Sequence, residues 1–162
     1  TLSRGLGDVY KRQPLNKNLD TKNLNIKIIN KNNIEHIGGT SVNVGNPHVV
    51  FFVDNIEDYD LKKIGPEIEN HNYFPEKCNV TLAKVISKKL IKVKVWERGA
   101  GLTKACGTAA CATAVAANIN GLTDKKTDIE FALGSLSITI DQNNSIHMKG
   151  PVSDITNIEI NI

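Results

Sequence analysis

The chain has 162 residues, of which 20 are lysine or arginine and 17 are aspartate or glutamate, so its net charge is +3. This length suits one domain, and the thinly spread lysines and scarce aromatic residues argue against the basic, stacking groove of a nucleic-acid binder. Three irregularly spaced cysteines argue against a disulfide framework and a zinc site, and predict a reduced, cytoplasmic setting. No apolar run approaches the ~20 residues of a membrane helix, which argues against a membrane protein.

The chain divides into three predicted parts. Residues 1–13 (TLSRGLGDVYKRQ) resemble translated adapter sequence, and we predict that they are a non-native leader outside the fold, with a short native leader as the alternative. Residues 14–40 are predicted to hold an Asn- and Lys-rich linker and the first strand, at residues 24–29 (LNIKII), where apolar and polar side chains partly alternate. The remaining residues, 41–162, form the predicted domain.

The middle of the chain predicts three strands and a short helix. Residues 48–53 (HVVFFV) form a continuous β-branched and aromatic run, which is typical of a fully buried strand. Asp60 is expected to cap a short helix, whose second part begins with Pro66 in its first turn, where a missing N–H has no cost. Residues 80–86 and 90–96 predict a strand pair joined by a polar turn.

The run at residues 107–121 (GTAACATAVAANING) predicts the central element of the fold. It is rich in alanine, the best helix former, and it ends on Gly121 at a suitable position after a helix. Because it is apolar on nearly every face, we expect it to be buried inside a sheet. Further strands are predicted at residues 128–133, 135–140, 146–149 and 155–162. Together these elements predict an α+β domain of short, mixed or antiparallel strands wrapped around a central apolar helix.

The most informative stretch for function is residues 96–112 (WERGAGLTKACGTAACA), in which a glycine-rich loop leads to Cys106 at the predicted helix start. Free N–H groups and a partial positive charge at that start should lower the pKa of the thiol, and a carboxylate can dock on the N–H groups of Gly107 and Thr108. The pattern predicts a site that holds the α-carboxylate of an amino acid beside a thiol aimed at its Cα. The alternative is that Cys106 is a small buried apolar residue, as we expect of Cys111 within the helix, whereas Cys78 is predicted to be an incidental loop residue.

Three other polar clusters accompany this stretch. GNPH contains Asn46 and His48, and FPEKCNV places Asn79 directly before a predicted strand; in both, the side chains either bind a ligand or cap a turn. Glu97 and Arg98 adjoin the glycine-rich loop, where arginine can bind a carboxylate through two hydrogen bonds, although such neighbouring charges are most often surface residues.

In this order, GNPH, FPEKCNV, WERGAGLTKACGTAACA and the later MKGP resemble the second-half signatures of diaminopimelate epimerases, and the resemblance extends from residue 14 to residue 162. It implies a diaminopimelate epimerase-like domain and the interconversion of LL- and meso-diaminopimelate, on the route to lysine and peptidoglycan. It also implies that two thiols transfer the proton without pyridoxal phosphate or a metal. The family's first half, which carries the other cysteine, is not among these residues, so we expect this fragment alone to be inactive.

The resemblance also implies a role for each matching position. Cys106 matches the catalytic cysteine. The positions that match substrate-binding residues are Asn46, Asn79, Glu97, Arg98, Gly107 and Thr108. Two positions, His48 and Glu97, match residues that tune the pKa of the catalytic thiols. The chain departs from the pattern at Ala109, where glycine is more common.

The expected partners are diaminopimelate, the missing N-terminal half and, as a homodimer, a second copy. Two alternatives remain open at this point. A proline racemase-like isomerase has a similar helix start, but it typically carries an aspartate where this chain has Glu97 and Arg98, and it lacks the FPxxxNV signature. The second alternative is a non-catalytic small-molecule-binding remnant of the same fold.

Overall fold

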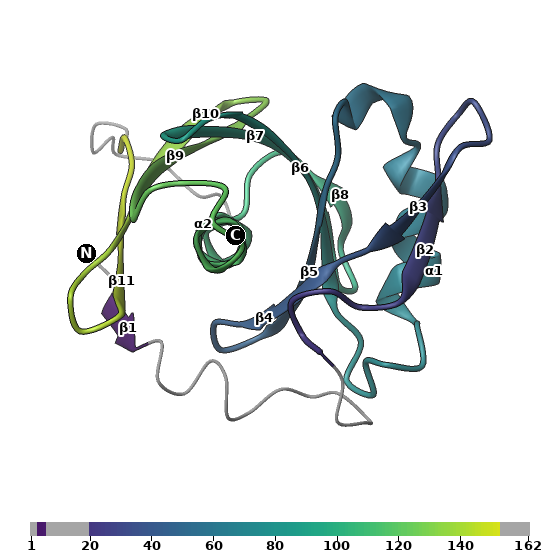
Figure 1. The fold of residues 1–162 in the computed structure, drawn as a ribbon, viewed down its shortest axis with the longest axis horizontal. Helices are drawn as coiled ribbons and strands as arrows, with labels where there is room; N and C mark the ends of the chain where they lie inside the picture. The colour runs from purple at the N-terminus through teal and green to yellow at the C-terminus, as the bar shows by residue number, and fades with distance from the viewer. Residues whose placement is uncertain (1–2, 6–19, 153–162) are drawn as a thin grey trace, which may run out of the picture.

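The computed structural model describes residues 3–5 and 20–152, and within them a curled mixed sheet encloses one helix (Figure 1). The sheet has nine strands in the order β1-β11-β10-β9-β7-β6-β5-β4, with β8 paired to β7. These strands are β1 (Ser3–Gly5), β4 (Thr40–Asn43), β5 (Pro47–Phe52), β6 (Asn79–Ser87), β7 (Leu90–Glu97), β8 (Gly101–Thr103), β9 (Lys126–Phe131), β10 (Gly134–Ile140) and β11 (Ser145–Lys149). A separate hairpin pairs β2 (Ile26–Ile29) with β3 (Glu35–Gly38).

The enclosed helix is α2 (Gly107–Ile119), seen end-on at the centre of Figure 1. Eight of its residues are buried, and six of these are alanines, whose small side chains let strands approach on several sides. The helix ends at Asn120, and Gly121 follows with φ +69°, a conformation that glycine adopts without strain. The predicted central apolar helix is therefore confirmed, because no single face of α2 is polar enough to lie in water.

A second core lies on the other side of β5 and β6, beneath α1 (Leu61–Glu69) and the β2–β3 hairpin. Val50 faces the core around α2, whereas Val49 and Phe51 face this second core. The continuous apolar run of β5 follows from this burial on both faces. A single-turn 3-10 helix at Ile56–Asp58 leads into α1.

The start of α1 follows the prediction, but its course does not. The Asp60 carboxylate accepts a hydrogen bond from the backbone N–H of Lys62 at 3.1 Å and caps the helix as expected. Pro66 lies inside one continuous helix rather than in the first turn of a second part, so the prediction of two parts was wrong. In so short a helix Pro66 removes one intrahelical hydrogen bond, and burial of Leu61, Ile64 and Ile68 holds the helix together.

Pairing between strands that are distant in sequence brings the residues of the candidate site together. β5 and β6 run parallel with His48 opposite Asn79, so the first residues of both strands lie at one edge of the fold. β6 and β7 are antiparallel, as predicted, and Val80 is opposite Trp96. The end of β7 therefore lies beside the starts of β5 and β6.

Most predicted strands are present, with boundaries shifted by at most two residues. Four strands were not predicted: β1, β3, β4 and β8, each only three or four residues long. The predicted strand at 155–162 lies outside the described residues, as does the proposed leader except for β1, which pairs with β11. The divisions at residues 13 and 40 stay predictions. Neither α1 nor α2 in the described ranges is long and apolar enough to cross a membrane.

Candidate active site

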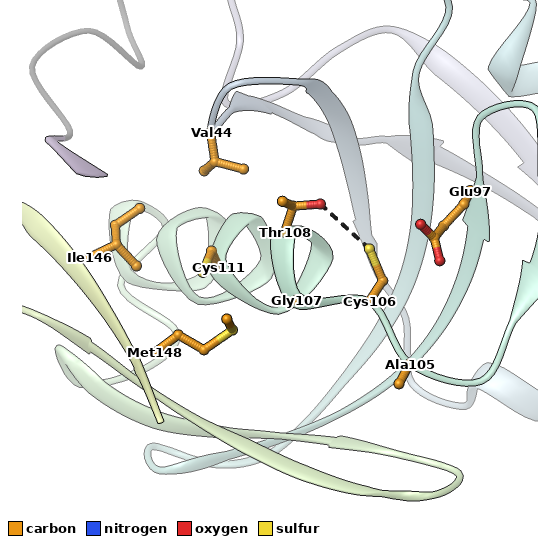
Figure 2. A pocket seen from close by; sticks show the side chains of 9 residues that line it. All are labelled: Val44, Glu97, Ala105, Cys106, Gly107, Thr108, Cys111, Ile146 and Met148. Carbon is orange, nitrogen blue, oxygen red and sulfur yellow. Dashed lines mark hydrogen bonds between the residues drawn. The ribbon is translucent and has the colours of Figure 1, made fainter. Parts of the chain in front are cut away.

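Cys106 occupies the N-cap position of α2. Its backbone is extended, with φ −151° and ψ 114°, and its carbonyl accepts the first helical hydrogen bond, from the N–H of Ala110 at 3.0 Å. The thiol is 8% exposed, and its Sγ lies 3.5 Å from the Oγ1 of Thr108 (Figure 2). The predicted placement of this thiol at a helix start is therefore correct.

The expected effect on the thiol's pKa is not found. Burial raises the pKa of Cys106 above its ordinary value, and the nearby Glu97 carboxylate raises it further. The Thr108 hydroxyl and the Ala109 N–H act in the opposite direction but do not outweigh burial. The prediction of a lowered pKa was wrong because it counted the helix start and not the low-polarity surroundings that desolvate the thiolate. Cys106 is thus a protonated thiol at neutral pH.

A cavity of about 460 Å³ opens at the start of α2. It is lined by Val44, Glu97, Ala105, Cys106, Gly107, Thr108, Cys111, Ile146 and Met148 (Figure 2). Its polar end consists of Glu97, Cys106 and Thr108, and its other walls are apolar. The N–H groups of Gly107 and Thr108 donate no hydrogen bond to the described part of the chain, as expected for the first turn of a helix. They remain available to an anion in the cavity.

Gly107 allows one wall of this cavity to pack closely. A Cβ atom at this position would lie 3.3 Å from both Sδ and Cε of Met148. Met148 reaches this position from β11, whose inward-facing side chains also include Ile146. In this structure the thioether of Met148 is the group that approaches the backbone of Gly107.

The polar residues singled out in the sequence form one connected network behind the cavity. The Asn46 amide Nδ2 donates to Thr108 Oγ1 at 3.3 Å, and Asn46 Oδ1 lies 3.0 Å from His48 Nε2. His48 Nε2 in turn lies 3.4 Å from Asn79 Nδ2, and Asn79 Oδ1 accepts the backbone N–H of Arg98 at 2.8 Å. Three motifs that are far apart in sequence therefore meet at one place. Of these five residues, only Thr108 lines the cavity itself.

His48 is a neutral member of this network. It is fully buried, and burial together with the positive charge of Arg98 lowers the pKa of its imidazole to about 3. The shorter contact, to Asn46 Oδ1, favours a proton on Nε2, which leaves Nδ1 as a buried acceptor with no partner in the described structure. A neutral imidazole influences Cys106 by holding Asn46 and Thr108 in place rather than by its charge.

The side chain of Arg98 points elsewhere. Its Nη1 donates to the backbone carbonyl of Glu76 at 2.6 Å, so the guanidinium lies beside the FPEKCNV loop rather than in the wall of the Cys106 cavity. Glu97, its neighbour, points toward Cys106 (Figure 2). The structure therefore brings the carboxylate and the thiol together and leaves the guanidinium at the edge of the site.

Several site residues were missed or undervalued. Cys111 was expected to be structural, yet it is only partly buried and lines the cavity, as do Val44 and Ile146. Alternation along β11 would have placed Ile146 and Met148 on one face, but it does not show that this face reaches the start of α2. Cys78 is fully buried, and its pKa is raised by burial and by the Glu69 carboxylate. This is consistent with the prediction that Cys78 has no role in the site. No cluster of three or more potential metal ligands occurs within residues 3–5 and 20–152.

Comparison with known proteins identifies one family. The family model described as "Diaminopimelate epimerase" matches residues 40–155. A diaminopimelate epimerase of Pelagibacter ubique (strain HTCC1062) is 74% identical over 149 residues, which are 92% of this chain and 54% of the relative. One from Bartonella quintana (strain Toulouse) is 50% identical over 111 residues, 68% of this chain and 39% of the relative. The chain thus spans about half the length, or less, of these relatives.

Among solved structures, similar folds come from phenazine biosynthesis proteins. A PhzF family protein of Bacillus anthracis is 19% identical with a TM-score of 0.47, and the match covers 65% of this chain and 35% of that one. A PhzF family protein of Enterococcus faecalis is 16% identical with a TM-score of 0.46, covering 60% of this chain and 35% of that one.

Proposed function

The chain belongs to the diaminopimelate epimerase family, and from this membership we propose that it supplies one of two acid–base thiols in a cofactor-independent epimerase. The proposed substrates are LL- and meso-diaminopimelate, and the proposed setting is the cytoplasmic route to lysine and peptidoglycan. Of the two alternatives, the proline racemase-like activity is favoured by no feature of the site.

One observation carries the proposal: Cys106 stands inside a cavity at the start of α2, next to two N–H groups that have no acceptor in the described part of the chain. A substrate α-carboxylate bound to the N–H groups of Gly107 and Thr108 would place its Cα beside Sγ. The same N–H groups would stabilise the negative charge that spreads onto the carboxylate when the Cα proton leaves. The apolar walls of the cavity would keep water away from part of this charge.

The proposed reaction needs a second thiol. A thiolate takes the Cα proton, the electron pair of the broken C–H bond stays on Cα and its carboxylate, and a thiol on the opposite face donates a proton to Cα. Because Cys106 is held as a thiol at neutral pH, it is ready to act as the proton donor. We propose that the second thiol comes from the half that the longer relatives possess in addition, and that the complete protein forms a homodimer.

The network residues take supporting roles in this proposal. Asn46 fixes the Thr108 hydroxyl, and Asn79 fixes the backbone of Arg98. We propose that the Arg98 guanidinium binds the distal carboxylate of diaminopimelate after it leaves the Glu76 carbonyl, with Asn46 and Asn79 beside it. Glu97 contacts the substrate and, with His48, tunes the proton affinity of Cys106.

Alkylation of the 162-residue chain tests the anion site next to the thiol. Iodoacetate carries a carboxylate and iodoacetamide does not, so we expect the iodoacetate-to-iodoacetamide rate ratio at Cys106 to be about two- to fivefold higher in the folded chain than in the chain unfolded in guanidinium. This range corresponds to the ~0.3–1 kcal/mol with which a helix N-terminus favours an anion. Tandem mass spectrometry separates modification of Cys106 from that of Cys111. An equal ratio in both states would contradict the carboxylate site.

The two-thiol requirement has its own test. The purified chain is incubated with meso-diaminopimelate in D₂O, and formation of the LL isomer, with deuterium at the inverted Cα, is followed by chiral chromatography and mass spectrometry. We expect no LL isomer above a Cys106→Ala control, because one thiol cannot remove a proton from one face of Cα and donate one to the opposite face. Inversion that depends on Cys106 would show that the chain needs no second half.

A further inference from the structure

The carboxylate of Glu69, at the end of α1, has no part in the mechanism above and is nevertheless buried, with an exposed fraction of 6%. Its Oε2 accepts a hydrogen bond from Trp96 Nε1 at 2.7 Å, and its Oε1 accepts one from the backbone N–H of Gly99 at 3.2 Å. Lys77 lies at the limit of an ion pair, 4.0 Å away. Burying a carboxylate is costly without partners. Here each of the two oxygens accepts a hydrogen bond, which offsets that cost.

A second contact from the same face of α1 holds the same tryptophan. Gly65 is four residues before Glu69, and a Cβ atom there would lie 2.5 Å from Cδ2 of Trp96. The indole ring therefore lies directly on the backbone of α1. The outer edge of the six-membered ring approaches Gly101, where a Cβ atom would lie 3.5 Å from Cη2 of Trp96. We call Gly65, Glu69, Trp96 and Gly99 the α1 clamp.

The two hydrogen-bond donors of the α1 clamp, Trp96 and Gly99, flank the site residues Glu97 and Arg98 in the sequence. Trp96 is the residue before Glu97, and Gly99 is the residue after Arg98. Both donors bind one carboxylate, so the turn between them is held at its two ends. The side chain of Glu97 then points toward Cys106 (Figure 2).

We propose that Glu69 is a positioning residue that holds the Glu97–Arg98 turn against the thiol. It touches neither Cys106 nor the cavity, and acts on the site through Trp96 and Gly99. The proposal rests on the proposed function, since Glu97 matters because it adjusts the protonation of Cys106.

The test measures Cys106 alkylation by iodoacetamide at pH 7 in the 162-residue chain. Glu69→Ala removes both clamp hydrogen bonds and Trp96→Phe removes one, and the phenyl ring keeps most of the packing on Gly65. Release of Glu97 from Cys106 should increase the rate about twofold to fivefold, the effect of losing one partly screened charge interaction. Glu69→Gln, which keeps one acceptor oxygen, should fall between Glu69→Ala and the unaltered chain.

A Glu97→Gln background separates positioning from general loosening of the fold. In that background the charge that the clamp positions is gone, so Glu69→Ala should leave the alkylation rate unchanged. Glu67→Gln, an exposed change of charge on the same helix, is the matched control and should have no effect in either background.

Two outcomes would overturn the proposal: Glu69→Ala and Trp96→Phe leave the rate unaltered, or they increase it equally with and without Glu97. The second result would mean that the clamp only stabilises the fold. If Glu69→Ala does not fold, the same comparisons rest on Trp96→Phe and Glu69→Gln. Iodoacetamide is neutral, so its rate does not depend on the proposed carboxylate site. Failure of that site would be seen in the iodoacetate-to-iodoacetamide ratio, and failure of the clamp would be seen in the iodoacetamide rates of these variants.

Discussion

Lowering the pH from 7 to 5 tests whether His48 is neutral in the folded chain. Its pKa is about 3 in the fold, against an ordinary value of 6.5, because the imidazole is buried and near Arg98. Protonation would also place an N–H on Nδ1, which has no acceptor in the described structure. The unfolded chain therefore binds a proton at this histidine between about pH 6.5 and 3, and the folded chain does not.

The sign and size of the effect follow from linkage. A group whose proton affinity is lower in the fold than in the unfolded chain makes the fold less stable as the pH falls through the unfolded pKa. With pKa values of about 3 and 6.5, one such group reduces the free energy of unfolding by about 2 kcal/mol between pH 7 and pH 5. Below about pH 3 both states are protonated, and the loss reaches its limit.

Urea unfolding at both pH values measures this loss, with the fluorescence of Trp96, the single tryptophan of the chain, as the probe. The unaltered chain should lose about 2 kcal/mol, whereas His48→Asn should lose most of this pH dependence whatever its absolute stability. His71→Asn is the control, because burial lowers the pKa of His71 too, but that side chain is far less buried. An equal loss in His48→Asn and in the unaltered chain would refute the reasoning.

Three further predictions concern the thiol, the clamp and the cavity wall. Thr108→Val removes a hydroxyl that lowers the pKa of Cys106, so the pH profile of iodoacetamide alkylation should move to higher pH. Gly65→Ala places a methyl group 2.5 Å from the indole of Trp96 and should cost about 1–3 kcal/mol in urea unfolding. Met148→Ala enlarges the cavity and should destabilise the fold by about 1–2 kcal/mol, below the range for a fully buried methionine, while bulky maleimides react faster at Cys106.

Each of these predictions has a matched control. Thr108→Ser keeps the hydroxyl and should keep the alkylation profile, and an identical shift in both variants would show that the hydroxyl is not the cause. Gly121→Ala introduces strain at φ +69° in open space, so Trp96 fluorescence should change with Gly65→Ala alone. If Met148→Ala left the maleimide rate unchanged, Met148 would not limit access to the thiol.

Local patterns predicted much of the fold. The alanine-rich run that starts at Gly107 specifies a helix by propensity and, by its lack of a polar face, specifies that it is enclosed. Strands β7, β9 and β10 were also predicted within two residues of their bounds, and burial alternates along β7 and β9 because one face of each packs against the helix. The short strands β3, β4 and β8 have too few residues for a period to be recognised, and they depend on their neighbours for pairing.

The members of the candidate site were also predictable, but their arrangement was not. The motifs containing Asn46, Asn79, Glu97 and Cys106 pointed to one site through the family that they resemble. That Asn79 lies beside His48 follows from the parallel register of β5 and β6, which no short-range pattern encodes. The separation of Arg98 from the cavity likewise follows from its bond to Glu76, a residue 22 positions away.

By itself the sequence determined the helix, the strand faces and the thiol at the helix start, because these depend on residues within a few positions of one another. The tertiary structure alone decided the proton affinities. The pKa of Cys106 is raised and that of His48 is lowered because distant strands remove water from both side chains. Desolvation depends on which segments fold over a group, so the pKa lowering expected from the helix start was reversed by surroundings contributed by other parts of the chain.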